Sequence, residues 1–338
     1  MQFDTLPQLG DSVSKICLGT MTWGQQNSEQ DAHEQMDYAL AQGVNFWDTA
    51  EMYPSPPDKD KQGDTERFMG SWFAKTGKRN DVVLASKISR NDFLRDGNTK
   101  FDKKTIRAAL DSNLQRLQTD HIDIYQLHWP ERQTNFFGQR GYTESMAQQD
   151  TKELTPFLET IEALNDEITK GRIRAYGLSN DTPWGVMRYL AEADKHGLAR
   201  PITIQNPYSL LNRLYEVGLA EISHREQIGL LAYSPLAFGV LSGKYLGGNK
   251  PANSRLSLYS HFTRYLNEQA QQATQAYAEV AKKHHLDMAQ MALAFVNSRS
   301  FVTANIIGAT TIEQLASNIA SVDLVLSQAV LADIEAVQ

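Results

Sequence analysis

The stretch NFWDTAEMYP, residues 45–54, begins with a short apolar run and then presents a carboxylate with no cation beside it. Phe46 and Trp47 come directly before Asp48, and Tyr53 follows five residues later. A short apolar run of this kind is typical of a strand that is buried on both faces of a parallel sheet. The stretch therefore predicts a buried strand that delivers an acid, and then a phenol, to its carboxyl end.

Seven further apolar runs recur along the chain, separated by segments with helical periodicity. The eight predicted strands are Ile16–Leu18, Val44–Trp47, Val82–Ser86, Ile122–Leu127, Ile173–Gly177, Ile202–Gln205, Gly229–Tyr233 and Asn305–Ile307. In residues 102–118 the apolar side chains follow helical spacing, with Asn113 as the one polar interruption. Eight alternating units predict an α/β fold, a (β/α)8 TIM barrel in a single domain over residues 1–338, with a doubly wound sheet as the alternative.

The lengths of the connections favour the barrel. Links from helix to strand are short, whereas several links from strand to helix are long: 49–63, 88–101, 129–154 and 234–267. In such barrels the functional site is built from the loops at the C-terminal ends of the strands. We therefore expect the site at that end.

Local signals add an N-terminal β-hairpin and the ends of one helix. The opening segment, residues 3–16, is typical of a hairpin that turns at residues 9–11 and could close the far end of the barrel. Ser28 followed by Asp31 predicts an N-cap with an acidic residue in the first turn, and Gly43 stands where that helix should end.

Composition narrows the class of protein. Of 338 residues, 41% are hydrophobic and 22% charged, which is typical of a soluble globular protein with a full-sized core. The net charge of −7 argues against a nucleic-acid partner or an anionic membrane surface. The single cysteine, Cys17, lies in an apolar run and allows no internal disulfide, which favours a core role in a reducing compartment. With no signal-like N-terminus and no membrane-length apolar stretch, we expect a cytoplasmic protein.

The ends of three neighbouring predicted strands carry chemically active side chains. The second strand ends in Asp48, the third in Lys87 and the fourth in His128, and Tyr53 lies in the loop after Asp48. A free tyrosine is a poor acid near neutral pH, but a nearby ammonium lowers its pKa. A carboxylate would hold that ammonium in place, and a neutral imidazole could orient a substrate oxygen. The set suits proton transfer to a carbonyl that accepts a hydride.

The source of the hydride is not a Rossmann motif, because no G-x-G-x-x-G follows a predicted strand. The glycine-rich residues 234–255 carry Lys244, Lys250 and Arg255, which suits a pyrophosphate held by backbone N–H groups and cations. A flexible surface loop is the alternative for this segment. Residues 308–311 open a helix whose N-terminus can take a phosphate.

Six segments together resemble the aldo-keto reductases, in the right order and at the right strand ends over nearly the whole chain. They are NFWDTAEMY (45–53), LASK (84–87), YQLHWP (125–130), YGLSN (176–180), IQNPYSLLNR (204–213) and LAYSPLAFGVLSGKY (231–245). Other segments are similar to the branch of this superfamily that includes the potassium-channel β-subunits. The resemblance implies a barrel and a catalytic tetrad made of Tyr53 as acid, Lys87, Asp48 and His128.

The same resemblance implies a nicotinamide cofactor and its contacts. The nicotinamide carboxamide would be held by Ser179, Asn180 and Gln205, and its ring would stack on Tyr233. The pyrophosphate would be lined by Ser234, Leu236, Gly239 and Lys244. Thr310 would lie near the 2′-phosphate, and Gln314 and Asn318 near the adenine. Further cofactor contacts are expected at Thr20, Met21 and Gly308, and Arg255 could pair with the 2′-phosphate and stack on the adenine. No acidic residue lies in residues 308–312 to take a free ribose hydroxyl, so NADPH/NADP+ is favoured over NADH. Where the channel subunits carry a glutamate, this chain has Ser317.

The sequence identifies the residues that would contact the substrate less specifically than those that would contact the cofactor. Trp23 and Trp129 are expected either to pack in the core or to form an apolar substrate wall at the mouth of the barrel. Residues 131–154 are expected to cover that mouth. The sequence contains no complete metal-ligand motif, so no metal is expected.

These observations predict an NADPH-dependent oxidoreductase that reduces small-molecule aldehydes or ketones to alcohols, with Tyr53 as the general acid. A nicotinamide sensor or partner-binding module with weak reductase activity is the alternative. A phosphate-binding barrel isomerase is a third possibility, although it would not require the Tyr, Lys, Asp and His set. The sequence leaves the oligomeric state open.

Overall fold

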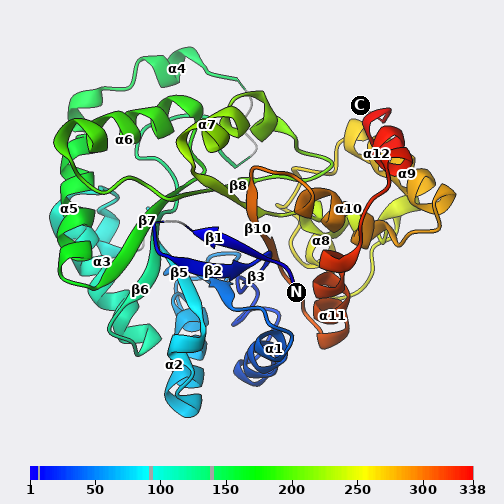
Figure 1. The fold of residues 1–338 in the computed structure, drawn as a ribbon, viewed down its shortest axis with the longest axis horizontal. Helices are drawn as coiled ribbons and strands as arrows, with labels where there is room; N and C mark the ends of the chain where they lie inside the picture. Colours follow the sequence, from blue (N-terminus) through cyan, green and yellow to red (C-terminus); the bar gives the residue numbers. More distant parts are fainter. Residues whose placement is uncertain (7, 91–93, 138–140, 338) are drawn as a thin grey trace.

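The computed structural model, which describes residues 1–6, 8–90, 94–137 and 141–337, is a closed barrel of eight parallel strands surrounded by helices (Figure 1). In order round the barrel, the strands are β10 (Val302–Ile307), β3 (Ile16–Gly19), β4 (Phe46–Asp48), β5 (Val83–Ile88), β6 (Ile122–Leu127), β7 (Ile173–Ser179), β8 (Thr203–Pro207) and β9 (Gly229–Tyr233). Because β10 pairs with both β9 and β3, the sheet closes on itself. The predicted (β/α)8 barrel is confirmed, and an open doubly wound sheet is excluded. That residues 1–338 form one domain stays a prediction.

Helices follow the strands and cover the outside of the barrel (Figure 1). The α-helices are α1 (Glu29–Ala41), α2 (Asp64–Thr76), α3 (Lys103–Leu117), α4 (Glu144–Ala147), α5 (Phe157–Thr169), α6 (Pro183–His196), α7 (Leu219–Glu226), α8 (Arg255–Leu258), α9 (Glu268–Lys283), α10 (Met288–Asn297), α11 (Ile312–Ala320) and α12 (Gln328–Glu335). Short 3₁₀ helices are η1 (Arg79–Asp81), η2 (Arg95–Gly97), η3 (Thr151–Glu153), η4 (Leu214–Val217), η5 (Ala237–Ser242), η6 (Leu246–Gly248) and η7 (Ser321–Asp323). Most of the irregular chain lies in the strand-to-helix links, as predicted.

The predicted ends of α1 are confirmed. The Ser28 hydroxyl accepts a hydrogen bond from the Asp31 N–H, and the Asp31 carboxylate accepts one from the Ser28 N–H, which completes a capping box. Gly43 follows the end of the helix with φ +81°, a left-handed conformation that glycine adopts without strain.

Alternation along the strands separates the interior of the barrel from the core beneath the helices. Phe46 and Val83 belong to the interior, whereas Leu84 packs under the helices. Because successive side chains of a strand point to opposite faces, Asp48 shares the inner face with Phe46, and Lys87 shares it with Val83. The apolar filling of the barrel thus ends in charged side chains at the C-terminal ends of β4 and β5.

The N-terminal hairpin of β1 (Phe3–Leu6) and β2 (Asp11–Ser14) closes the opposite end of the barrel (Figure 1). Leu6 and Val13 from the hairpin join the apolar interior cluster that also contains Cys17. Cys17 is fully buried and forms no disulfide, and burial raises the pKa of its thiol well above the usual value. The hairpin is therefore a plug, and Cys17 is a core residue, as predicted.

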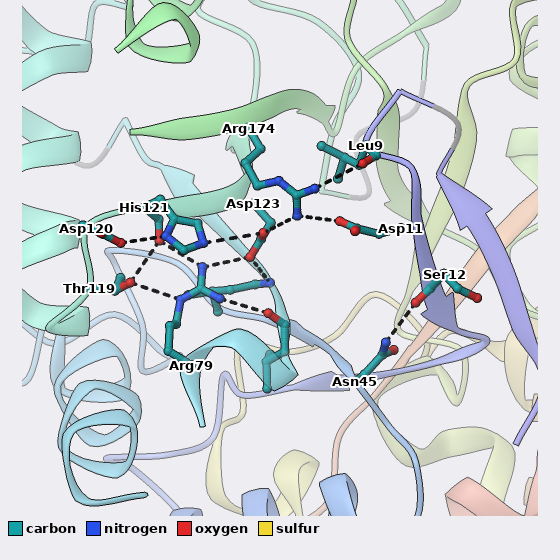
Figure 2. A network of polar contacts seen from close by, with 12 residues as sticks. Leu9, Asp11, Ser12, Asn45, Arg79, Thr119, Asp120, His121, Asp123 and Arg174 are labelled. Atoms are coloured by element: carbon teal, nitrogen blue, oxygen red, sulfur yellow. Dashed lines mark hydrogen bonds and ion pairs between the residues drawn. The ribbon is translucent and has the colours of Figure 1, made fainter. Parts of the chain in front are cut away.

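A network of ion pairs ties the plug to the barrel wall (Figure 2). One Asp123 oxygen accepts hydrogen bonds from Arg79 and from the Leu84 N–H, both at 2.8 Å. The other accepts one from Arg174 at 2.8 Å, and the Arg174 guanidinium also pairs with Asp11 of the hairpin. Every oxygen of this buried carboxylate therefore has a donor.

In the described ranges, no single helix is long and apolar enough to cross a membrane, and only the bent pair Ile312–Asp323 and Gln328–Glu335 meets that length and composition together.

Candidate active site

Four inward-facing polar side chains form the layer above the apolar interior, one each from β4, β5, β6 and β8. Asp48 is the centre of this layer, because one of its oxygens accepts hydrogen bonds from Gln126 at 3.1 Å and from Gln205 at 2.7 Å. Its other oxygen accepts a hydrogen bond from the Lys87 ammonium at 2.6 Å. The Asp48 carboxylate is thereby fixed by three neighbouring side chains before any ligand binds.

The Lys87 ammonium is fully buried beneath the site. It donates to Asp48, to the Thr49 carbonyl at 2.7 Å and towards the Tyr53 hydroxyl at 3.5 Å. Burial alone would lower the pKa of Lys87, but the negative charge of Asp48, with Tyr53, raises it above the usual value. The lysine therefore stays charged, because the carboxylate compensates for the loss of water.

Tyr53 lies over this pair, with the Lys87 Nζ also 4.9 Å from the centre of its ring. Burial raises the pKa of Tyr53, and the nearby Lys87 charge opposes that rise without overcoming it. The sequence led us to expect a lowered pKa. The difference arises because the phenol is buried along with the lysine, and desolvation of the phenolate outweighs the single positive charge.

His128 completes the predicted set. Its ring lies edge-on to Tyr53, with centroids 5.9 Å apart, and its Nδ1 is 2.7 Å from the Ser89 hydroxyl. Burial, with the Lys87 charge, lowers the pKa of His128 well below its usual value, so the ring is neutral at pH 7. If Ser89 donates to Nδ1, the proton of the neutral ring sits on Nε2.

Two loops that carry these groups are joined by a buried carboxylate that sequence reasoning missed. Glu51, from the loop that carries Tyr53, accepts hydrogen bonds from the Ser89 N–H and from Arg95. The Arg95 guanidinium also donates to the Ser89 carbonyl. Glu51 and Arg95 thus fix Ser89, which contacts His128. No sequence signal marks this contact, because it depends on how two long loops meet.

A cavity of about 1030 Å³ opens above the tetrad and extends to the start of α11. Asp48, Tyr53 and His128 line it, whereas Lys87 lies behind them. The predicted cofactor residues that line it are Thr20, Met21, Asn180, Gln205, Tyr233, Ser234, Leu236, Gly239, Lys244, Arg255, Gly308, Thr310, Gln314 and Asn318. Ser179 lies just beneath, where its hydroxyl donates to the Gln205 carbonyl at 2.9 Å and accepts from Asn180.

The two tryptophans predicted for the core or the substrate wall lie in different places. Trp129 lines the cavity and packs against Phe137 with ring centroids 5.5 Å apart. Trp23 does not line it. Trp23 is fully buried in the core and donates to Gln35 at 3.2 Å, so its placement corrects the prediction of a substrate wall. Residues 138–140 of the predicted cover, residues 131–154, lie outside the described residues.

At the glycine-rich loop, the backbone lies close to a cation. Gly239 has φ +90°, and a Cβ at this position would stand 3.1 Å from the Lys244 Nζ. A larger residue would therefore push the ammonium away. Arg255 packs with its guanidinium carbon 5.9 Å from the Phe238 ring centre, and its charge reaches Tyr53. That Arg255 contacts the adenosine end of a cofactor stays a prediction.

The far end of the cavity is the N-terminus of α11. Thr311 caps the helix, and the Gln314 side chain accepts a hydrogen bond from the Thr310 N–H at 3.1 Å. Asn318 donates to the Gly308 carbonyl at 3.2 Å. Glu313 also lines the cavity here, an acidic neighbour that sequence reasoning did not weigh.

Other residues of the cavity were also missed, above all Arg264, from the segment before α9. The only signal in the sequence was its place in the long link of residues 234–267. Among the described residues, no group of three or more His, Cys, Asp or Glu side chains could hold a metal ion.

Comparisons with known proteins agree with this architecture. Residues 15–338 match the model of the aldo/keto reductase family. The chain is 53% identical to Protein tas of Escherichia coli, an alignment that covers 100% of this chain and 97% of the relative. It is 34% identical to the uncharacterized oxidoreductase YrpG of Bacillus subtilis, over 98% and 94% of the two chains.

A more distant relative is the probable voltage-gated potassium channel subunit beta of rice, 29% identical over 100% of this chain and 96% of the relative. The resemblance inferred from the sequence motifs is confirmed by these matches. The family is one of oxidoreductases that generally use nicotinamide cofactors. On its full-length matches and its barrel, the chain belongs to the aldo/keto reductase family.

Proposed function

We propose that this protein reduces aldehydes or ketones to alcohols with NADPH, and that Tyr53 is the general acid. The observation that carries the proposal is the buried Lys87, held between Asp48 at 2.6 Å and the Tyr53 hydroxyl at 3.5 Å at the floor of a large cavity. A buried ammonium is costly unless it is paired, and here its second neighbour is an ionisable phenol. That arrangement suits a phenol that must give up a proton during turnover.

In the proposed reaction, the Tyr53 O–H bond breaks as a new O–H bond forms at the carbonyl oxygen. The electron pair left on the phenolate oxygen is stabilised by the Lys87 charge, and solvent later returns the proton. His128 lies beside Tyr53, and its Nε2–H would hold the same carbonyl oxygen through a hydrogen bond. The bound cofactor supplies the hydride that reduces the carbonyl carbon.

The residues of the cavity fit such a cofactor. Amide groups of Asn180 and Gln205 lie at the tetrad end, and Lys244 lies against the glycine backbone in the middle. The N-terminus of α11 and Thr310 lie at the far end, where positive helix ends and N–H groups favour a phosphate. We propose NADPH over NADH on the cations of the loop, with Glu313 as the residue that could weaken this preference.

The test is NADPH oxidation over a panel of aldehydes, dicarbonyls and ketones by the wild-type protein and by Tyr53→Phe. Loss of one positioned general acid costs roughly 100- to 10,000-fold in kcat. We expect that loss, with the dissociation constants of NADPH and of NADH, measured by fluorescence titration, unchanged from wild type. A Tyr53→Phe variant that keeps its turnover would overturn the role of the tyrosine.

A nicotinamide sensor or partner-binding module is the second candidate function. It is supported by the similarity to the rice protein whose name is probable voltage-gated potassium channel subunit beta. This candidate predicts tight NADPH binding but oxidation by the whole carbonyl panel no faster than in buffer. The same two measurements therefore separate it from the first proposal.

A further inference from the structure

Two arginines from the link between β9 and α9 enter the cavity and share one aromatic ring. The Arg255 guanidinium carbon lies 5.9 Å, and that of Arg264 5.5 Å, from the centre of the Phe238 ring. Both residues line the cavity. Within the described chain, neither guanidinium forms an ion pair with a carboxylate. The cavity therefore contains two positive charges that the protein does not neutralise.

Arg264 differs from Arg255 because two of its own donors are buried and unused. Its Nε and Nη1 are shielded from solvent, and no described residue accepts a hydrogen bond from either atom. The nearby Tyr265 hydroxyl is likewise buried without a partner. A buried donor without an acceptor costs roughly 1–3 kcal/mol, and more when it is charged. Such a cluster in a cavity wall indicates an acceptor that comes from a ligand.

The position of Arg264 ties that acceptor to the reacting end of the cavity. The guanidinium lies beside the phenol of Tyr233: burial raises the pKa of Tyr233, and the charge and hydrogen bonding of Arg264 oppose the rise. The Tyr233 hydroxyl donates to Asn180 at 2.6 Å, and Asn180 donates to the His128 carbonyl at 2.9 Å. Arg264 therefore lies beside a tyrosine that is hydrogen-bonded, through Asn180, to the backbone of His128.

The cavity also has apolar side chains near Tyr53 and His128. Met52, Trp129 and Phe137 line the mouth beside Tyr53. A ligand that fills this space needs a carbonyl at Tyr53, an apolar or aromatic body, and an anionic group within reach of Arg264. A guanidinium binds a carboxylate through two parallel N–H···O hydrogen bonds.

We propose that Arg264 binds the carboxylate of the substrate, so that the substrates of this enzyme are carbonyl compounds with a carboxylate group. The proposal rests on the reductase function proposed above and specifies its substrate class. The phosphates of the cofactor are the other source of an anion in the same cavity, and the experiment separates the two.

The experiment compares Arg264→Gln with wild type on two substrate pairs: 4-carboxybenzaldehyde with methyl 4-formylbenzoate, and succinic semialdehyde with butanal. Each pair keeps an aldehyde and differs in the carboxylate. We expect wild type to prefer the acid in at least one pair, and Arg264→Gln to lower the ratio of kcat/KM for acid over neutral partner roughly 10- to 100-fold. The loss should fall on KM, and Arg264→Lys should restore part of it.

Arg107→Gln is the matched control, because this exposed cation on α3 does not line the cavity, and its removal changes the net charge equally. The NADPH dissociation constant is measured for each variant. An equal loss on acid and neutral partner, together with weaker NADPH binding, would show that Arg264 binds the cofactor and would overturn the proposal. An unchanged ratio would overturn it as well.

A binding measurement keeps the two proposals distinguishable. The product analogue 4-(hydroxymethyl)benzoate is titrated into the NADPH-bound protein with its methyl ester as the neutral control, and cofactor fluorescence is the readout. Binding of the acid that Arg264→Gln abolishes would support the carboxylate site even if no aldehyde is turned over, which would then refute the reductase function alone. Turnover of neutral aldehydes without any preference for the acid would refute the carboxylate site alone.

Discussion

Each end of the barrel contains a buried carboxylate, but the cations that pair with the two carboxylates have different further contacts. At the plugged end, Asp123 has a donor on each oxygen, and one of its two arginine partners, Arg79, lines an open surface hollow (Figure 2). At the open end, Asp48 is also fully bonded, but its partner Lys87 reaches past it to Tyr53, which lines the cavity. One end completes its network within the protein, whereas the other leaves an ionisable group, Tyr53, facing the cavity.

The difference separates groups that stabilise the fold from groups that we propose take part in the reaction. In barrels of this kind the N-terminal end serves stability and the C-terminal end carries the site. Arg79 and Arg174 are neutralised at the plugged end, while Arg255 and Arg264 at the open end have no carboxylate partner among the described residues. Substitutions at the two ends should therefore act on different measured quantities.

The largest effect is expected for Lys87→Met, which should reduce both activity and stability. Removing one partner of a buried ion pair costs about 3–5 kcal/mol in the free energy of unfolding, because the other charge stays buried. Without the ammonium, the Tyr53 phenolate loses its stabilising charge, and kcat should fall roughly 100- to 10,000-fold. Urea unfolding and NADPH oxidation measure the two losses.

The double variant Lys87→Met with Asp48→Asn tests whether the two losses are separate. The asparagine keeps an oxygen for Gln126 and Gln205 but removes the uncompensated charge. Most of the lost stability should return, while kcat stays at the level of Lys87→Met. Recovery of activity together with stability would mean that Lys87 serves the fold and not the reaction.

A smaller effect is expected at the plugged end, for Asp123→Asn. The substitution weakens the charged hydrogen bonds to Arg79 and Arg174 and should lower the free energy of unfolding by about 2 kcal/mol. Because this end has no part in the proposed reaction, kcat should stay within a factor of about two, since a twofold change corresponds to less than half a kcal/mol. Asp120→Asn is the control, because Asp120 pairs with His121 through a side chain that is 95% exposed. Such a pair contributes less than about 1 kcal/mol.

The difference in stability between wild type and Asp123→Asn should depend on pH. Burial raises the pKa of Asp123, but Arg79, the Leu84 N–H and Arg174 together hold it below the usual value. A carboxyl with a lowered folded pKa adds stability above its unfolded pKa, near 3.9, and loses it as the pH falls through the folded pKa. The stabilities of wild type and Asp123→Asn should therefore converge below about pH 4. A difference that stays constant as the pH falls further, through the folded pKa of Asp123, would assign the effect to packing.

Much of the architecture could be predicted from the sequence, because alternating apolar runs report directly on strands and helices. That Asp48, Lys87 and His128 lie together could also be predicted, since each ends a run. Contacts between loops could not. Glu51 and Arg95 meet at Ser89 only after two long links have folded.

Burial was the second quantity that the sequence did not specify. Asn113 interrupts the apolar face of α3, yet it is fully buried and satisfied by Glu66 and the Tyr125 hydroxyl. Trp23 follows the first strand like a mouth residue, yet it turns into the core. In both cases the pattern indicated the element or loop to which the residue belongs. The surroundings of the side chain depend on tertiary packing, which the pattern does not contain.

The smallest effect is expected in the pH profile of the reaction, and it tests the corrected pKa of Tyr53. Reduction requires a protonated phenol and a neutral imidazole. Burial raises the pKa of Tyr53 above 10 and lowers that of His128 well below 6.5. Neither group should change its charge between about pH 6.5 and pH 9, so kcat for aldehyde reduction should vary less than twofold across that range. A fall in kcat centred near neutral pH would show that Lys87 outweighs burial at Tyr53 once the cofactor is bound.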